Sequence, residues 1–237
     1  GTSVEGALIA EPKFRPLLKR IEQLKLFVLA HPYQPSPKGG LDRYYLISSM
    51  GFPLDTSLLA AHLMASGALD ELKSLQFILP HGGGFLPYLI GRLEHAYHAR
   101  PEPRANTATT PREHLKRFVF DALTHDPVAA RCLIDTVGAE RVVLGSDCPF
   151  DMEDVAPVAS LERVPGLTDH ERERICSLNA LELEHFPGMA EDEIGRVMAE
   201  AESRWPLQGL CVIHRYGRIQ AGEQIVLVIT ASAHRQA

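Results

Sequence analysis

Three apolar runs in the sequence each end in a residue that can bind a metal ion or carry a proton. LFVLAHP contains His31, FILPHGGG contains His81, and VVLGSDCPF contains Asp147. In a parallel α/β barrel, the side chains at the carboxyl ends of successive strands converge on one mouth, so residues distant in sequence can share a site. Imidazole and carboxylate groups bind divalent cations at about 2 Å. The pattern therefore predicts a metal-assisted hydrolytic or decarboxylating centre.

The three residues are expected to play different roles. His31 and Asp147 have the chemistry of metal ligands, and Asp147 could also take a proton from metal-bound water. His81 could be a ligand, but the glycines that follow it leave room for a substrate, which favours a general acid/base or a donor to a substrate oxygen. The structural alternatives are a hydrogen-bonded histidine and, for Asp147, a helix N-cap. The joint pattern favours a site.

Arg92 lies about three helical turns beyond His81 in the sequence. Its guanidinium could clamp a substrate carboxylate, and the alternative is a solvated surface arginine. Six further histidines share no spacing and are expected at the surface or in packing: His62, His95, His98, His114, His125 and His170.

The elements that must position these residues alternate between helix and strand over residues 1–180. PKFRPLLKRIEQL has helical spacing of its apolar residues, and LFVLAHP follows as a continuous apolar run typical of a buried parallel strand. Similar units follow, with KRFVFDAL as a further strand. The alternation predicts an α/β fold with a parallel sheet, an incomplete TIM-type (β/α)8 barrel. The proline-rich segment 100–111 is expected to project as a loop, a lid or a dimer contact.

The pattern changes after Asn179, and we place a domain boundary near Leu181. Residues 189–208 predict a charged amphipathic helix, and GLCVIHRYG and EQIVLVITASAH predict strands of a hairpin or small mixed sheet. Residues 181–237 are therefore expected to form a small α+β segment.

Composition narrows the function classes. The chain has 237 residues, 45% of them hydrophobic, and a formal net charge of −6 with both signs interspersed. These values predict a globular protein with a small-molecule substrate and without a nucleic-acid partner. No apolar run approaches the roughly 20 residues that cross a bilayer, so we expect a cytoplasmic protein with no membrane partner. The four scattered cysteines form no C-x-x-C pair.

HP, PHGGGFLPYLIGRLEH and VVLGSDCPF resemble the amidohydrolase-related family that includes aminocarboxymuconate semialdehyde decarboxylase. Over residues 1–180 the resemblance implies a (β/α)8 barrel that binds a divalent ion, usually zinc, and acts on a small carboxylated substrate. It implies that His31 and Asp147 bind the metal and that His81 is the acid/base. It also implies a homodimer in which Arg92 reaches the substrate of a neighbouring subunit.

Family members begin with an H-x-H pair of ligands on the first strand, and the printed sequence has no such pair. The resemblance therefore predicts the C-terminal half of a barrel, with weak metal affinity.

From Leu183 onward, LEHFPGMAEDEIGRVMAEAESRWPL, VIHRYGRIQAGE and ASAHR resemble the molybdopterin synthase catalytic (large) subunit. That resemblance implies a small sulfur-carrier partner and places His234 and Arg235 near an anionic substrate. The family's catalytic lysines lie beyond this motif. Three hypotheses follow: a metal-dependent decarboxylase or hydrolase, a molybdopterin synthase relative, and a non-catalytic fusion remnant that acts as an interaction module.

Overall fold

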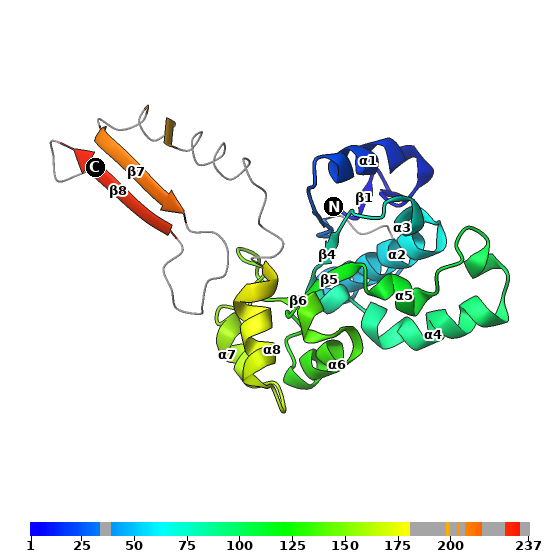
Figure 1. Cartoon of the computed structure of the whole chain (residues 1–237). Helices are drawn as coiled ribbons and strands as arrows, with labels where there is room; N and C mark the ends of the chain where they lie inside the picture. Colours follow the sequence, from blue (N-terminus) through cyan, green and yellow to red (C-terminus); the bar gives the residue numbers. More distant parts are fainter. Residues whose placement is uncertain (34–38, 181–197, 200–202, 204–206, 215–225, 233–237) are drawn as a thin grey trace. The chain divides into compact units, whose positions relative to one another are not determined.

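The computed structural model describes residues 1–33, 39–180, 198, 199 and 203, and the backbone of 207–214 and 226–232. The chain divides into two compact units, Gly1–Asn179 and Ala180–Ala237 (Figure 1).

A four-stranded parallel sheet lies at the centre of the first unit, with its strands in sequence order. Its strands are β3 (Val28–Leu29), β4 (Phe77–Leu79), β5 (Phe118–Asp121) and β6 (Val142–Val143). Each strand pairs with the next one along the chain, so every connection is a crossover of the same kind. The predicted α/β fold with a parallel sheet is confirmed.

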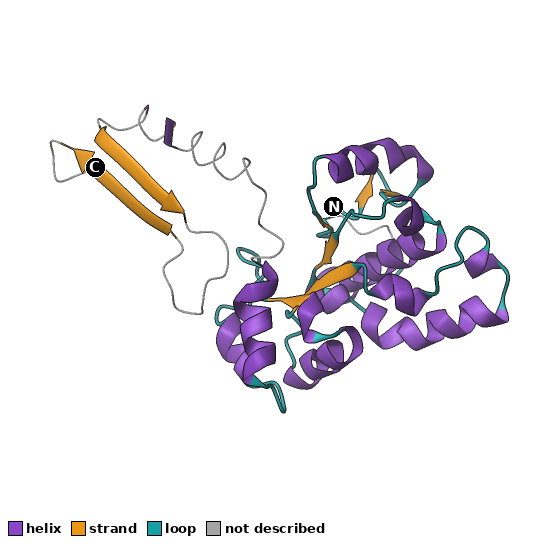
Figure 2. Ribbon diagram, in the orientation of Figure 1, coloured by secondary structure: helices purple, strands orange, loops and turns teal. Residues whose placement is uncertain are grey.

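Helices fill the connections between these strands (Figure 2). The α-helices are α1 (Arg15–Gln23), α2 (Phe52–Ala65), α3 (Ala68–Glu71), α4 (Leu86–Ala99), α5 (Pro111–Leu115), α6 (Pro127–Val137), α7 (Pro157–Glu162) and α8 (Asp169–Glu173). Shorter turns of 3-10 helix are Pro12–Phe14, His81–Gly83, Glu102–Arg104 and Ala139–Arg141, and π-helical turns are Ile47–Gly51 and Arg174–Leu178. A small antiparallel pair, β1 (Ser3–Val4) and β2 (Ala7–Leu8), precedes them.

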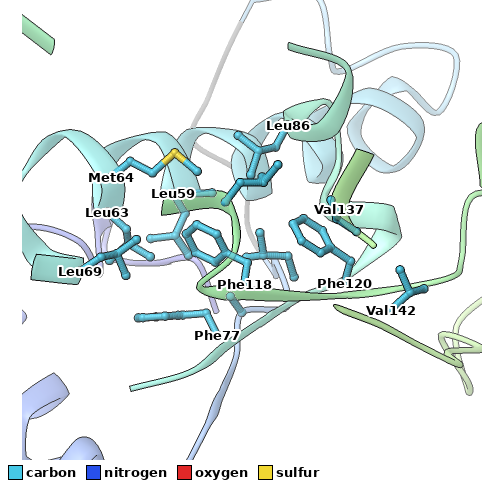
Figure 3. Packing of buried hydrophobic residues seen from close by; sticks show 14 of the residues in the cluster. Leu59, Leu63, Met64, Leu69, Phe77, Leu86, Phe118, Phe120, Val137 and Val142 are labelled. Atoms are coloured by element: carbon cyan, nitrogen blue, oxygen red, sulfur yellow. The ribbon is translucent and has the colours of Figure 1, made fainter. Parts of the chain in front are cut away.

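One face of the sheet carries the largest buried side chains. Phe77 and Phe118 are partners in the register, with ring centroids 6.2 Å apart. Phe120 follows on the same face, 6.5 Å from Phe118, and all three rings are inaccessible to solvent. Figure 3 shows them beside Leu59 and Leu63 of α2. Because burying one such ring stabilises a fold by about 2 to 3 kcal/mol, this face anchors the sheet to its helices.

The opposite face of the sheet leads to the predicted site. Side chains alternate between the two faces of a strand, so Leu29 and Asp121 lie on the face opposite the phenylalanines. His31 lies two residues after Leu29, in the loop that follows β3. Val143 of β6 lies on this same face, and Asp147 follows in the loop after β6.

The strands are shorter than the apolar runs predicted. Pro80 ends β4 because proline has no N–H to donate to the ladder. β6 ends at Val143, and the N–H of Leu144 donates to the carbonyl of Ile175 at 3.0 Å on the edge of the chain away from β5. His31, His81 and Asp147 therefore lie in the loops just beyond the strands.

Segment 100–111 is a loop, but the expectation that all of it projects is wrong. Thr107 is buried, and the hydroxyls of Thr107 and Thr109 both donate to the carboxylate of Asp70 in α3. The Tyr97 hydroxyl also donates to the carbonyl of Ala108 at 2.8 Å. These bonds hold the second half of the segment against the body of the unit.

The second unit contains the antiparallel pair β7 (Leu207–His214) and β8 (Val226–Ser232), as the hairpin prediction required. Most of the predicted helix 189–208 lies outside the described residues. Among the helices that are described, none is long and apolar enough to cross a membrane.

Candidate metal centre

Two histidines and an aspartate meet beyond the carboxyl ends of the sheet. Nε2 of His31 lies 2.9 Å from Oδ1 of Asp147, and Nε2 of His81 lies 3.5 Å from Oδ2. One potential ligand atom from each residue lies within 4.8 Å of the others. The three side chains are 27%, 10% and 15% exposed for His31, Asp147 and His81 respectively. The cluster is thus shielded but open to solvent.

Unusual backbone conformations aim two of these side chains. His81 and Asp147 have φ angles of 56° and 59°, in the left-handed region that non-glycine residues enter infrequently. Such conformations persist where the surroundings fix them, and they gather at functional sites.

Contacts with two neighbouring rings orient the His31 side chain. The imidazole of His31 stacks on the ring of Phe150, with centroids 5.4 Å apart and an interplanar angle of 15°. Its other neighbour is the His81 ring, edge-on at 5.1 Å. Phe150 belongs to the same loop as Asp147, so this loop supplies both a carboxylate and an aromatic support for His31.

The protonation state of His81 suits a ligand or a base. Burial lowers the pKa of His81 below its ordinary 6.5, and the Asp147 carboxylate opposes this shift without overcoming it. The imidazole is therefore neutral at pH 7. Its Nδ1 is buried without a hydrogen-bond partner among the described residues.

These donors fit a divalent cation. Two imidazole nitrogens and a carboxylate match the ligand types of zinc and related first-row ions. Ligands bound to one ion at about 2.1 Å lie at most about 4.2 Å apart, so the cluster would contract by less than about 1 Å. Among the described residues, this is the one group of three such side chains with that spacing.

A cavity of about 560 Å³ opens beside the cluster, and His81 and Asp147 line it. Its walls include Phe52 and the amino-terminal residues Phe85 and Tyr88 around α4. The volume and the apolar walls are those of a site for a small organic molecule.

Of the other residues singled out in the sequence, His125 lines this cavity and Arg92 does not. Arg92 is exposed on α4 and does not line this cavity, so its contact with a neighbouring subunit's substrate stays a prediction. His234 and Arg235 lie outside the described residues. His114 is buried against Asp70, whereas His125 is exposed and lines the cavity.

Asp121 is a residue of this site that the sequence reasoning missed. Its Oδ1 accepts hydrogen bonds from the N–H groups of Gly82 at 2.8 Å and Leu123 at 3.1 Å. Removal from solvent raises the pKa of Asp121 to about 6, although these bonds oppose the shift. The signal was present, because FVFD, like the other three runs, leads into a side chain that can bind a metal ion or carry a proton.

The family model described as Amidohydrolase matches residues 3–183. The chain belongs to the amidohydrolase family. The amidohydrolase portion is 32% identical to 2-amino-3-carboxymuconate-6-semialdehyde decarboxylase from Dictyostelium discoideum over 183 residues, 77% of this chain and 51% of that protein. It also resembles the crystal structure of 5-carboxyvanillate decarboxylase LigW from Sphingomonas paucimobilis, with a TM-score of 0.69 and 24% identity over 77% of this chain and 56% of that one. The predicted barrel-type fold is confirmed.

A second family model, described as MoaE protein, matches residues 166–237. The molybdopterin synthase catalytic subunit of Mesorhizobium japonicum is 70% identical over 66 residues, 28% of this chain and 42% of that protein. Both predicted resemblances are therefore confirmed as partial matches. The chain spans about half the length of the curated relatives it matches.

Proposed function

We propose that the amidohydrolase portion is a metal-dependent decarboxylase or hydrolase of a small carboxylated substrate. The observation that carries the proposal is the meeting of His31, His81 and Asp147 beside a cavity of about 560 Å³. The similarity to a decarboxylase of an aminocarboxymuconate semialdehyde supports the reaction class.

His31 and Asp147 would hold a divalent cation, for which we propose zinc. When bound, the cation polarises a substrate oxygen or lowers the pKa of a water molecule. His81 carries the proton, since its imidazole is neutral at pH 7 and faces the cavity. In a decarboxylation, the bond to the carboxyl carbon breaks and the carbon left behind must take up a proton. The neutral His81 imidazole would first accept a proton from water or from a substrate hydroxyl and then deliver it to that carbon. The apolar walls hold the rest of the substrate.

Metal analysis of the purified full chain tests the cation site. We expect more than about a tenth of an equivalent of zinc or manganese in the wild type, and loss of the metal in His31→Ala and in Asp147→Ala. His95→Ala is a matched control, because His95 is exposed on α4 and lies outside the cavity. A metal content below about a tenth of an equivalent in the wild type, unchanged in His31→Ala and Asp147→Ala, would argue against a metal centre.

Carbon dioxide release from a panel of carboxylated aromatic and muconate-type acids tests the reaction. His81→Ala should abolish release while the metal content stays above half of that in the wild type. Turnover that survives His81→Ala would remove His81 from the mechanism.

A second candidate function concerns the C-terminal segment. We propose that residues 166–237 bind a small sulfur-carrier protein, as supported by the 70% identity to a molybdopterin synthase catalytic subunit. His234 and Arg235 would then lie near an anionic substrate. A pull-down with that carrier tests the proposal, and absence of binding at micromolar concentration would remove it.

A further inference from the structure

Asp121 connects the strand end of β5 to the turn that carries His81. Its Oδ1 lies 2.8 Å from the backbone nitrogen of Gly82 and 3.1 Å from that of Leu123, and both N–H groups donate to it. The two donors come from different loops, one after β4 and one after β5. A single carboxylate oxygen therefore joins the two loops.

The turn after β4 needs such an acceptor. His81, Gly82, Gly83 and Gly84 have φ angles of 56°, 61°, 75° and 64°, so four successive residues adopt left-handed or related conformations. A buried backbone N–H in such a turn cannot donate to a neighbouring strand. It must therefore donate to a side chain or to water. Asp121 supplies the acceptor for Gly82, the residue directly after His81.

Asp121 also lies against the segment that carries Asp147. A Cβ atom at Gly145 would stand 2.8 Å from Cβ and 3.1 Å from Oδ2 of Asp121. Real Cβ atoms do not approach another carbon this closely, so the absence of a side chain at Gly145 allows the aspartate to pack there. Gly145 is two residues before Asp147. The Asp121 side chain thus touches the backbone of both loops from which the cluster is built.

We infer that Asp121 is a positioning residue that sets the placement of His81 relative to Asp147. It acts through the backbone of Gly82 and the close contact at Gly145. This inference rests on the proposed function, because it assigns Asp121 to the support of the same metal centre. Partners that support metal ligands in this way typically contribute tenfold to 100-fold in metal affinity.

Three substitutions in the full chain test the inference. Asp121→Ala removes both the acceptor for Gly82 and the side chain that packs at Gly145, two residues before the ligand Asp147. It should therefore weaken zinc binding about tenfold, measured by competition with a chromophoric chelator. Asp121→Asn keeps an Oδ1 acceptor of the same shape and should stay within about threefold of the wild type. Gly145→Ala leaves Asp121 in the sequence but displaces it, and should weaken binding in the same direction as Asp121→Ala.

Glu22 provides a control of matched chemistry away from the site. Its Oε1 accepts hydrogen bonds from the N–H groups of Ser74 at 2.7 Å and Leu75 at 3.2 Å, so it too joins separate segments. Glu22→Ala should lower the thermal midpoint of unfolding without changing zinc affinity. Equal losses of affinity in Glu22→Ala and Asp121→Ala would mean a general loss of structure and would overturn the inference.

A measurement on the metal-free protein separates this inference from the proposed function. The imidazole ¹H–¹⁵N resonances of His81, assigned with His81→Gln, should shift in Asp121→Ala and return in Asp121→Asn. Unchanged resonances in Asp121→Ala would overturn the positioning role. If the wild type binds neither zinc nor manganese, the proposed function fails, and the His81 resonances still decide whether Asp121 positions His81.

Discussion

Two aspartates in the first unit hold histidine side chains, and they differ in what else reaches the carboxylate. Asp70 lies 3.1 Å from Nε2 of His114 and also accepts hydrogen bonds from the hydroxyls of Thr107 and Thr109. Asp147 lies against His31 and His81, and no hydroxyl from the described residues donates to it. The Asp70 carboxylate accepts hydrogen bonds from two threonine hydroxyls in addition to its contact with His114. The Asp147 carboxylate faces two imidazole nitrogens and a cavity.

A histidine–aspartate contact alone therefore does not mark a functional site. A carboxylate whose lone pairs accept hydroxyl hydrogen bonds has few lone pairs left for a cation. The Asp70 carboxylate instead binds the loop 107–110 to α3. A carboxylate met by imidazoles leaves lone pairs for a cation. The adjoining cavities agree, since the one beside His114 is about 60 Å³ and the one beside Asp147 is about 560 Å³.

The largest expected effect is on metal binding at the Asp147 cluster. Asp147→Ala and His31→Ala each remove a ligand and should weaken zinc binding by more than about 100-fold, with little change in the free energy of unfolding of the metal-free protein. Chelator competition and urea titration measure the two quantities. A comparable loss of affinity in His114→Ala would erase the distinction between the clusters.

The next effect is on stability at the Asp70 cluster. Asp70→Ala leaves two threonine hydroxyls and the buried His114 without their acceptor, so the free energy of unfolding should fall by about 3 kcal/mol. Urea denaturation of the metal-free protein measures it. Zinc affinity should stay within about twofold of the wild type, and a larger change would show that the two clusters are coupled.

The pH dependence of the two clusters should also differ. Zinc binding requires a neutral imidazole and an ionised carboxylate, so zinc affinity should fall as the solution is acidified from pH 7 to pH 5. Burial would raise the pKa of Asp70, but bonds from Thr107, Thr109 and His114 outweigh it and hold the pKa below 3.8.

A carboxyl whose pKa is lower in the folded state stabilises the fold above its unfolded pKa and loses this contribution as pH falls through the folded value. The stability difference between wild type and Asp70→Asn should therefore be the same at pH 7 and pH 5, and shrink only below about pH 3.8. A difference that already shrinks between pH 7 and pH 5 would contradict the assignment.

The smallest effect concerns the orientation of His31. Phe150→Ala removes the ring that stacks on the imidazole, a contact of about 0.5 to 1 kcal/mol, so zinc affinity should fall about threefold. Phe150→Tyr keeps the stacked ring and serves as the control. Equal losses in both variants would show that the stacking does not orient His31.

The sequence predicted the Asp147 cluster because its members follow apolar runs that form parallel strands of one sheet, β3, β4 and β6. Sequence order was enough there, since successive strands pair in that order. The Asp70 cluster was not predicted. His114 lies 44 residues from Asp70 in the sequence, on the short helix α5, and the position of α5 depends on tertiary packing.

Asp121 shows a different limit of sequence reasoning. Its run FVFD ends in an acidic residue in the same way, but its partners are backbone N–H groups in a left-handed turn. The sequence alone does not show the direction of those N–H groups. The apolar runs also predicted longer strands, since they did not reveal that the paired residues are only Phe77–Leu79 in β4 and Val142–Val143 in β6.

The central claim is that one cation binds between His31 and Asp147, and anomalous diffraction from zinc-soaked crystals of the full chain tests it most directly. We expect an anomalous peak about 2.0 to 2.2 Å from a ring nitrogen of His31 and from a carboxylate oxygen of Asp147. No peak there at saturating zinc, or a peak bound by other residues alone, would contradict it.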